Sequence, residues 1–412
     1  MNMPKLLQID SCLGIYSTGH ITEGIAEIAM NRGWECYIAH GARYIGKTIQ
    51  NSYKITSKYD EYFHYINSLL FDTHGLHSTL ATKKLLKWID YINPDVINLH
   101  CIHGYHINYE ILFDYLQLKN IPVVWTFHDC WSFTGHCSHF ESVGCDKWKI
   151  ECNNCALKYD YPKCVGFDNS RRNYKIKKKT FLSIPNLEIV SVSKWLNGLV
   201  CQSFFKDMPK RVIYNGIDTD IFKYRESNLR ERYGLCNKIV LIAAASTWSQ
   251  AKGLSDYIEL SKRLSDEYKI VLVGLTDKHI QSLPKGILPI PKTNNAIELA
   301  ELYSMADISL NLSYQETFGL TTVEAMACGT PVIVYNKTAS PELITPETGI
   351  VVKAGNLEDL IYAIKTISLN GKAKYSKECI ERAKKEFDKK ARFNDYINLY
   401  DSLIGRNHNI KI

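Results

Sequence analysis

The chain has 412 residues, a length that predicts two or three domains and leaves room for a large core. Hydrophobic residues make up 45% of it and charged residues 23%, which is typical of a globular enzyme and excludes a disordered chain. The formal net charge of +7 is mild for this length, so we expect no nucleic-acid partner, although a local basic patch can still meet a phosphate or an anionic membrane.

We expect a cytoplasmic protein. The opening residues, MNMPKLLQID, contain no apolar segment of the kind that a signal peptide needs, and no run of the sequence approaches the ~18 apolar residues of a membrane-spanning helix. Peripheral contact with the inner face of the cell membrane stays open as a second expectation.

The first half of the chain alternates short apolar segments with helical patterns. We expect strands at 6–10, 34–41, 94–100, 121–129 and 187–193. Helices are expected at 21–33, 83–91 and 109–118, and a loop from Gly14 to Gly19 precedes the first of them. Short apolar strands separated by helices predict a parallel sheet that is covered on both faces.

An insertion interrupts this alternation between about residues 130 and 180. It is rich in Cys, Lys, Asn and Tyr, and it ends in a basic helix, Arg171–Lys179. This helix can bind an anionic lipid or the phosphate of an acceptor, or it can simply present a solvated face. The sequence leaves both interpretations open.

The second half repeats the alternation. Strands are expected at 238–246, 269–274, 306–313, 330–335 and 349–355, and helices at 253–266, 295–305, 320–328, 356–368, 372–390 and 392–404. We therefore predict an α/β protein with two facing Rossmann-like domains, residues 1–213 and 214–386. The last helix, within 387–412, is expected to cross back to the first domain.

The segment 313–331, SYQETFGLTTVEAMACGTP, places two carboxylates around the start of a helix. Glu316 lies in the loop after a predicted strand, and Glu324 lies within the helix that Gly319 opens. The backbone N–H groups of residues 318–321 are then free for a diphosphate, and Gly319 has no side chain to block its approach. A capped amphipathic helix with solvated acids is the alternative, and the order strand, loop, glycine, helix favours the ligand site.

This Glu-x7-Glu pattern resembles the donor-site signature of the retaining glycosyltransferases of family 4, which have the two-domain GT-B fold. The resemblance extends along nearly the whole chain, through Ser17–His20, Asn215–Asp218 with Phe222, Ser340–Glu342 and Gly349–Val352. The segment HDCWSFTGHC and the cysteines after it resemble a narrower group that builds capsule or colanic acid.

The resemblance implies roles for individual residues. Glu316 holds the donor sugar, Glu324 the ribose and Lys252 the phosphates, while His128 faces the reacting centre; Glu316 and His128 are the implied catalytic residues. The implied donor-binding set is Gly19, Lys252, Glu316, Phe318, Gly319, Leu320, Thr321 and Glu324. Relatives carry a Gly-Arg pair about five residues before the lysine, whereas this chain has Ala245-Ser246-Thr247-Trp248, so a second phosphate-binding cation is either missing or supplied from elsewhere.

His128 directly follows a predicted strand, where it can hydrogen-bond a sugar hydroxyl or stabilise charge. A buried histidine that a neighbour satisfies is the alternative. His100, His103 and His106 follow another strand and can line the acceptor side, and simple placement in a loop is favoured over metal binding for these three.

Four of the thirteen cysteines, Cys137, Cys145, Cys152 and Cys155, follow one another at spacings of seven, six and two residues, with Cys164 nearby. A Cys-x2-Cys pair supplies two thiolates from one turn, and two more complete a tetrahedral zinc site without an open position, so this zinc would be structural. Free thiols and labile disulfides are the alternatives. No cofactor is expected for catalysis.

The resemblance therefore predicts a retaining glycosyltransferase. Its expected donor is a nucleotide diphosphate sugar, with UDP or GDP as the nucleotide, and its expected acceptor is a glycan or a polyprenyl-diphosphate-linked glycan of a surface polysaccharide. A nucleotide-sugar hydrolase or epimerase of the same fold and a non-catalytic nucleotide-binding protein are the alternatives.

Overall fold

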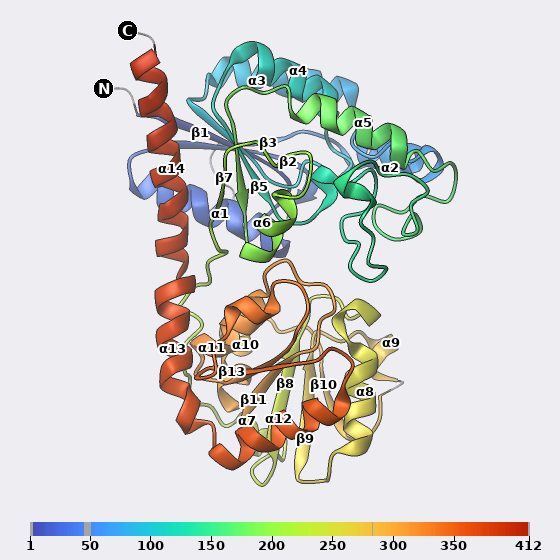
Figure 1. Ribbon diagram of the computed structural model, residues 1–412. Coiled ribbons are helices and arrows are strands. Elements are labelled where there is room, and N and C mark those ends of the chain that lie inside the picture. The colour runs from blue at the N-terminus through green and yellow to red at the C-terminus, as the bar shows by residue number, and fades with distance from the viewer. Residues whose placement is uncertain (1–2, 45–50, 282, 411–412) are drawn as a thin grey trace. The chain divides into compact units, whose positions relative to one another are not determined.

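The computed structural model describes residues 3–44, 51–281 and 283–410, which form two compact units (Figure 1). The first unit comprises residues 1–213 and 390–412, and the second comprises residues 214–389. Each is built around its own parallel sheet.

The first unit contains a seven-stranded sheet in the order β3-β2-β1-β4-β5-β6-β7, in which every pairing is parallel. Its strands are β1 (Lys5–Leu13), β2 (Glu35–Tyr44), β3 (Ser52–Lys54), β4 (Val96–Leu99), β5 (Val123–Phe127), β6 (Leu187–Ser191) and β7 (Lys210–Val212). Every residue of β4, β5 and β6 is buried, as the continuous apolar runs predicted.

Helices cover both faces of this sheet. They are α1 (Tyr16–Asn31), α2 (Lys58–Phe71), α3 (Thr79–Ile92), α4 (Tyr109–Lys119), α5 (Ser170–Phe181), α6 (Lys194–Val200) and α14 (Lys389–Ile410). Neighbouring residues of β5 point to opposite faces: Val124 packs with α1 and α14, whereas Trp125 packs against Phe113 of α4 and Phe181 of α5. In Figure 1, α3, α4 and α5 run together along the same side of the sheet.

The C-terminal helix α14 belongs to the core of the first unit from Lys390 onward. Phe393, Ile397 and Tyr400 are buried with residues of α1 and the sheet. The Asn98 amide donates to the Tyr400 hydroxyl at 2.7 Å, so a polar bond inside the core fixes the helix on β4. The chain thus crosses back to its first half.

The second unit contains a six-stranded parallel sheet in the order β10-β9-β8-β11-β12-β13. Its strands are β8 (Ile239–Ala244), β9 (Tyr268–Val273), β10 (Ile287–Ile290), β11 (Ile308–Asn311), β12 (Val332–Tyr335) and β13 (Gly349–Val352). Its helices are α7 (Leu229–Arg232), α8 (Leu254–Arg263), α9 (Asp277–Ile280), α10 (Ala296–Met305), α11 (Leu320–Ala327), α12 (Leu357–Asn370) and α13 (Ala373–Phe387). Short 3-10 helices, η3 (Gln250–Lys252) and η4 (Ser340–Leu343), follow β8 and β12.

The chain enters and leaves the second unit at two segments that lie side by side. Ile217 bonds through its backbone to Phe387 and Lys389, each at 2.8 Å, and the Lys389 ammonium lies 2.7 Å from the Asp218 carboxylate. A β-carbon on Gly216 would lie 2.4 Å from the Lys389 Cα, so only glycine allows this approach. The Asn-Gly-Ile-Asp segment therefore has a structural role at this crossing.

Several elements were not expected from the sequence. No element was assigned between residues 42 and 82, where β3 and α2 lie, and the short strands β7 and β10 were also missed. The loop expected from Gly14 to Gly19 is wrong in its length: α1 begins at Tyr16, so Ser17–His20 form the first turn of a helix.

Candidate functional site

In the second unit, two oppositely charged side chains meet beyond the carboxyl ends of β8 and β11. Lys252 ends η3, and Glu316 lies in the loop between β11 and α11. The Lys252 ammonium lies 2.5 Å from a Glu316 carboxylate oxygen, and both side chains remain partly exposed. Because an ion pair at this exposure is weak, the lysine can exchange its partner for an incoming phosphate.

Gly319 starts α11 in a conformation that other residues rarely adopt. Its φ is 106°, and a β-carbon built on it would lie 3.1 Å from Leu343 Cδ1 and 3.4 Å from Glu316 Cγ. The first turn of any α-helix has N–H groups without helical acceptors, and here they belong to the partly exposed residues Leu320 and Thr321. The geometry is that of an anion-binding helix start.

Phe318 has a different role from its neighbours. Its side chain is 2% exposed and packs against Tyr214 and Phe387, with ring centroids 5.8 and 5.7 Å away. It therefore anchors the loop in the core, and only its backbone is left to meet a ligand.

Glu324 lies one turn further along α11. The Tyr303 hydroxyl donates to its carboxylate at 3.3 Å. The residue is partly exposed, but desolvation by the surrounding protein raises the pKa of the carboxyl to about 7. A hydroxyl pair that donates to this carboxylate would favour its ionised form.

The loop that carries Glu316 is held by the segment before η4. The Glu316 N–H donates to the Thr338 hydroxyl at 3.0 Å, and the Ala339 N–H donates to the Glu316 carbonyl at 3.1 Å. Asn311, at the end of β11, donates to the Thr322 hydroxyl at 2.9 Å and so ties the strand to α11. Sequence reasoning did not identify Thr338 or Asn311, since each acts through distant contacts.

The segment 245–248 has no cation, and it places the exposed Thr247 beside a buried aromatic ring. Trp248 is 5% exposed, and its indole N–H donates to the Val273 carbonyl at 2.9 Å. This contact fixes the loop after β8.

In the first unit, His128 directly follows β5 and is partly exposed. Its Nε2 lies 3.0 Å from His100 Nδ1, and the two rings stack with centroids 5.4 Å apart. Desolvation lowers the pKa of His128 to about 4, so the ring is neutral and suits a hydrogen bond to a hydroxyl better than a role as a cation.

A second pair, which the sequence did not indicate, lies beside His128. His103 Nε2 lies 2.9 Å from an Asp129 carboxylate oxygen, and the His103 ring stacks on Trp131. Desolvation opposes ionisation of Asp129, but the charge and hydrogen bond of His103 outweigh it and lower its pKa to about 2. The pair joins two loops at the carboxyl ends of β4 and β5, which only folding brings together.

The other residues expected in this region are less accessible. His100 and His106 are 2% and 0% exposed, so they support the surface rather than line it. A β-carbon on Gly19 would lie 3.2 Å from the Gly14 nitrogen and 3.3 Å from Cys12 Sγ. Gly19 therefore lets the loop after β1 pack closely against the start of α1.

Two family models match consecutive parts of this chain. Residues 29–221 match the model described as Glycosyltransferase Family 4, and residues 227–386 match the model described as Glycosyl transferases group 1. Together these matches take in most of the chain. The protein is a glycosyltransferase with the GT-B fold.

Similar proteins agree with this assignment. The glycosyltransferase is 24% identical to the "Putative colanic acid biosynthesis glycosyl transferase WcaC" of Escherichia coli K12 over 324 residues, which are 75% of this chain and 77% of that protein. It is 28% identical to the "N,N'-diacetylbacillosaminyl-diphospho-undecaprenol alpha-1,3-N-acetylgalactosaminyltransferase" of Campylobacter jejuni, over 40% of this chain and 45% of that protein.

A solved structure matches over nearly its full length. The Anabaena protein HepE, crystallised with UDP, covers 97% of this chain and 100% of its own, with a TM-score of 0.66 and 16% identity. This likeness shows that the two proteins share the fold.

The cysteines of the glycosyltransferase's insertion meet in one small cavity. Thr134, His136, Cys137, Phe140, Cys145, Lys147, Trp148, Cys152, Asn153, Cys155 and Ser170 line it. Among the residues that the structure describes, no three His, Cys, Asp or Glu side chains are already arranged to hold a metal ion. All thirteen cysteines are free thiols, so the structure contains no disulfide among them.

The basic run at the end of the insertion lies on α5, which buries one of its lysines and leaves other cations exposed. Lys177 is 1% exposed and donates to the Trp131 and Thr134 carbonyls at 2.7 and 3.0 Å, whereas Arg172, Lys178 and Lys179 are exposed. Desolvation lowers the Lys177 pKa to about 7. Lys177 therefore belongs to the core of the insertion.

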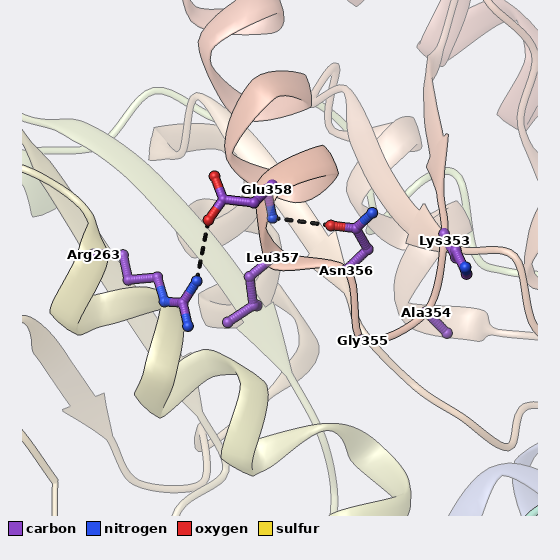
Figure 2. Close-up of a pocket in the computed structure, with 7 residues that line it drawn as sticks. All are labelled: Arg263, Lys353, Ala354, Gly355, Asn356, Leu357 and Glu358. Atoms are coloured by element: carbon purple, nitrogen blue, oxygen red, sulfur yellow. Dashed lines mark hydrogen bonds and ion pairs between the residues drawn. The ribbon is translucent and has the colours of Figure 1, made fainter.

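A surface groove of the second unit lies at the start of α12, outside the predicted donor residues. Figure 2 shows its lining: Arg263 pairs with the Glu358 carboxylate at 3.2 Å, and Asn356 caps the helix by accepting from the Glu358 N–H at 3.1 Å. Arg263, Glu358 and the Asn356 side-chain oxygen thus already have partners.

Among the helices of the described residues, none combines the length and the apolar character that a membrane span requires.

Proposed function

We propose that this glycosyltransferase moves a sugar from a nucleotide diphosphate sugar to a glycan or lipid-linked glycan, with retention at the anomeric carbon. The observation that carries the proposal is the Lys252–Glu316 pair beside the helix start at Gly319. A cation, a set of unpaired backbone N–H groups and a hydroxyl-accepting carboxylate lie together in the order that a diphosphate sugar requires.

The donor's parts have separate partners in this proposal. The diphosphate takes Lys252 and the N–H groups of Leu320 and Thr321, which frees Glu316 to accept from hydroxyls of the transferred sugar. The ribose hydroxyls donate to Glu324. UDP or GDP is the expected nucleotide, and the HepE structure with UDP supports the first of these.

The transfer step needs no nucleophile from the protein. An acceptor hydroxyl oxygen attacks the anomeric carbon, the bond from that carbon to the diphosphate breaks, and the hydroxyl proton passes to the leaving phosphate oxygen on the same face. The family resemblance implies that His128 faces the reacting centre, and its neutral ring suits a hydrogen bond to a sugar hydroxyl. Retention rests on the family resemblance together with this arrangement.

Surface polysaccharide is the proposed product. The names of the Escherichia coli and Campylobacter relatives describe colanic acid biosynthesis and an undecaprenol-diphosphate-linked acceptor. A polyprenyl-diphosphate acceptor would place the enzyme at a membrane surface, and the first unit has a surface of suitable chemistry.

This surface, called the α2 surface, consists of exposed apolar side chains on α2 and the segment before α5. Its members are Tyr59, Tyr62, Phe63, Leu70, Phe71, Val165 and Phe167. Tyr59, Tyr62 and Phe63 share one face of α2 and are 87%, 64% and 65% exposed, and Phe167 stacks on Phe71 at its end. Exposed apolar side chains in such a group mark a site of association.

The exposed cations of α5 adjoin the α2 surface. Asn169, just before α5, donates to the Phe71 carbonyl at 2.7 Å, and Figure 1 shows α2 and α5 on the same side of the first unit. Exposed aromatic rings on α2 together with exposed cations on α5, namely Arg172, Lys178 and Lys179, have the composition that binds anionic lipid surfaces. Peripheral membrane contact is therefore part of the proposal.

The α2 surface is tested by sedimentation with vesicles. We expect wild-type protein to pellet with phosphatidylglycerol vesicles more than with phosphatidylcholine vesicles, and Phe63→Ser to pellet less with both. Tyr362→Ser replaces a 75% exposed side chain of α12 and serves as the matched control. Equal pelleting of the Phe63→Ser variant and wild type contradicts membrane contact through this surface.

The main experiment measures nucleotide release with and without lipid-linked glycan acceptors. Transfer requires the acceptor, a hydrolase or epimerase does not, and a binding protein releases nothing. Glu316→Ala is expected to lower transfer by about 100- to 1,000-fold, the effect of losing one group that holds the reacting sugar. Glu358→Ala, in the groove of Figure 2, is the control carboxylate; wild-type transfer by Glu316→Ala contradicts the donor site.

A further inference from the structure

We propose that Cys137, Cys145, Cys152 and Cys155 bind one structural Zn²⁺ ion through four thiolates. The sequence spacing suggested these residues, and folding brings all four to the same cavity although seventeen residues separate the first from the last. The cavity lies in the first unit and shares no residue with the proposed donor site.

The surrounding segment has little regular structure of its own. Between Thr134 and Asn169 it contains only the short 3-10 helix η2, Lys147–Lys149, among the described residues. Its apolar content next to the cavity is small, chiefly the stacked rings of Phe140 and Trp148, 5.0 Å apart. A segment of this kind gains most from a bound metal, because the metal supplies the order that a small core cannot.

The thiols already contact one another and donors that favour thiolates. The Cys137 and Cys155 side chains hydrogen-bond each other. The backbone amides of Gly135 and Leu157 hydrogen-bond Cys152 and Cys155 respectively. Amide donors aimed at cysteine sulfur support a metal-bound thiolate in the same way.

An independent observation concerns His136, which lines the same cavity. Its Nδ1 lies 2.5 Å from the Asp72 carboxylate, whereas its buried Nε2 has no hydrogen-bond partner in the protein. A buried ring nitrogen without a partner costs about 1–3 kcal/mol. A thiolate of the cluster is the acceptor that this nitrogen needs when it carries a proton.

The charge balance also fits a four-thiolate site. Zn²⁺ replaces four thiol protons, and the resulting centre carries two negative charges. The buried ammonium of Lys177 interacts with Cys152 and Cys137, and Lys147 lines the cavity, so cations are in place to offset these charges. With four protein ligands the ion has no open position, and its role is to hold the insertion together.

Binding requires a rearrangement of the cysteine side chains. The described side chains are not yet grouped around a point where three of them could hold a metal. Rotation of the cysteine side chains toward the cavity provides the grouping, since all four line its wall. The Cys137–Cys155 hydrogen bond is replaced by two zinc–sulfur bonds in this step.

The proposal is tested by elemental analysis of full-length protein purified without added metal, and again after incubation with ZnCl₂ and desalting. We expect about one zinc per chain. Cys152→Ser and Cys155→Ser are expected to retain less than about a tenth of it, while Cys201→Ser, at an exposed cysteine elsewhere in the first unit, keeps the full amount. Wild-type protein without zinc under both conditions overturns the proposal.

A second measurement uses the wild-type protein, so its result does not depend on whether a variant folds. Replacement of the zinc in wild-type protein by Co²⁺ should give the intense visible absorption of a tetrahedral thiolate site, and the four cysteines should resist alkylation until a chelator is added. A cobalt spectrum without sulfur-to-metal charge-transfer bands overturns the proposal of a thiolate site. Full zinc in Cys145→Ser together with loss in His136→Ala overturns the four-thiolate ligand set.

Discussion

The two units have the same kind of sheet but different chemistry where their strands end. In the second unit the carboxyl ends of β8 and β11 lead to charged, partly exposed side chains, Lys252 and Glu316. In the first unit β4 and β5 lead to neutral histidines, His100 and His128. The comparison teaches that a parallel sheet provides a place for ligands, whereas the residues after its strands decide which ligand it suits.

Burial is the physical reason for this difference. Desolvation keeps His100 and His128 uncharged, which suits hydrogen bonds to sugar hydroxyls. The Lys252 and Glu316 side chains are 33% and 17% exposed, so both retain water and can exchange each other for phosphate and hydroxyl groups. The predictions that follow test this contrast.

The largest expected effect is acid destabilisation of the first unit. His64 and His106 have pKa values of about 3, His128 has one of about 4, and those of His74 and His100 lie well below the ordinary value, in each case mainly through desolvation. Below pH 6.5 the unfolded chain binds protons that the folded chain does not, so stability falls as the pH falls, by about 1.4 kcal/mol per pH unit for each such histidine.

This effect can be measured by urea unfolding at pH 7.5 and pH 5.5. Tryptophan fluorescence reports mainly the first unit, because six of the seven tryptophans lie there: Trp34, Trp88, Trp125, Trp131, Trp148 and Trp195. An equal midpoint at both pH values contradicts the assignment of neutral buried histidines. His64→Gln, which retains a polar side chain of similar size, should reduce the pH dependence.

Loss of the cation in the second unit is expected to weaken nucleotide binding. Lys252→Met removes one charge-assisted contact with a phosphate, an effect of about 1.5–3 kcal/mol or roughly 10- to 100-fold in affinity. Titration calorimetry with UDP and GDP measures it, and Lys353→Met, in the groove of Figure 2, is the control. Unchanged affinity in Lys252→Met excludes this lysine as the phosphate partner.

A smaller effect is expected at the helix start. Gly319→Ala forces a β-carbon into a left-handed conformation close to Leu343, which costs about 1–2 kcal/mol. The variant should bind nucleotide more weakly and melt at a lower temperature, while Gly198→Ala, where a β-carbon meets nothing, should do neither. Differential scanning fluorimetry with and without nucleotide distinguishes the two variants.

The smallest predicted effect is a pH dependence of donor binding. Because burial raises the pKa of Glu324 to about 7 and ribose hydroxyls favour the carboxylate, donor affinity should fall as the pH drops below 7, by at most about tenfold per pH unit. Glu324→Gln should bind donor more weakly at pH 8 and show a flatter profile. A steep profile in the Gln variant assigns the titration to another group.

Sequence patterns predicted the elements that are regular and buried. The apolar runs of β4, β5 and β6 read directly as strands, and the helix after Gly319 was expected to begin where α11 begins. Helix α2 was missed because its apolar residues face solvent as well as the core, which obscures the helical period. The edge strands β3, β7 and β10 are short and give little signal.

Long-range contacts were beyond sequence reasoning. His103 and Asp129 come from different loops, and their pairing requires β4 and β5 to be neighbours in the sheet. From the sequence, Lys177 belonged to a basic run that could face lipid. The turn of α5 directs its side chain into the insertion instead, where its ammonium donates to two backbone carbonyls. In both cases the chemistry depends on a partner that lies far away in the chain.

Sequence patterns by themselves therefore predicted the alternating architecture and the group of cysteines, because short-range periodicity and turn chemistry leave direct traces in the order of residues. The glycosyltransferase interpretation of the segment around Glu316 came from its resemblance to a known family. Tertiary structure decided which of these side chains are charged and which are accessible. Desolvation and pairing depend on everything packed around a group, so the neutral His128, the ionised Asp129 and the raised pKa of Glu324 are properties of the folded chain.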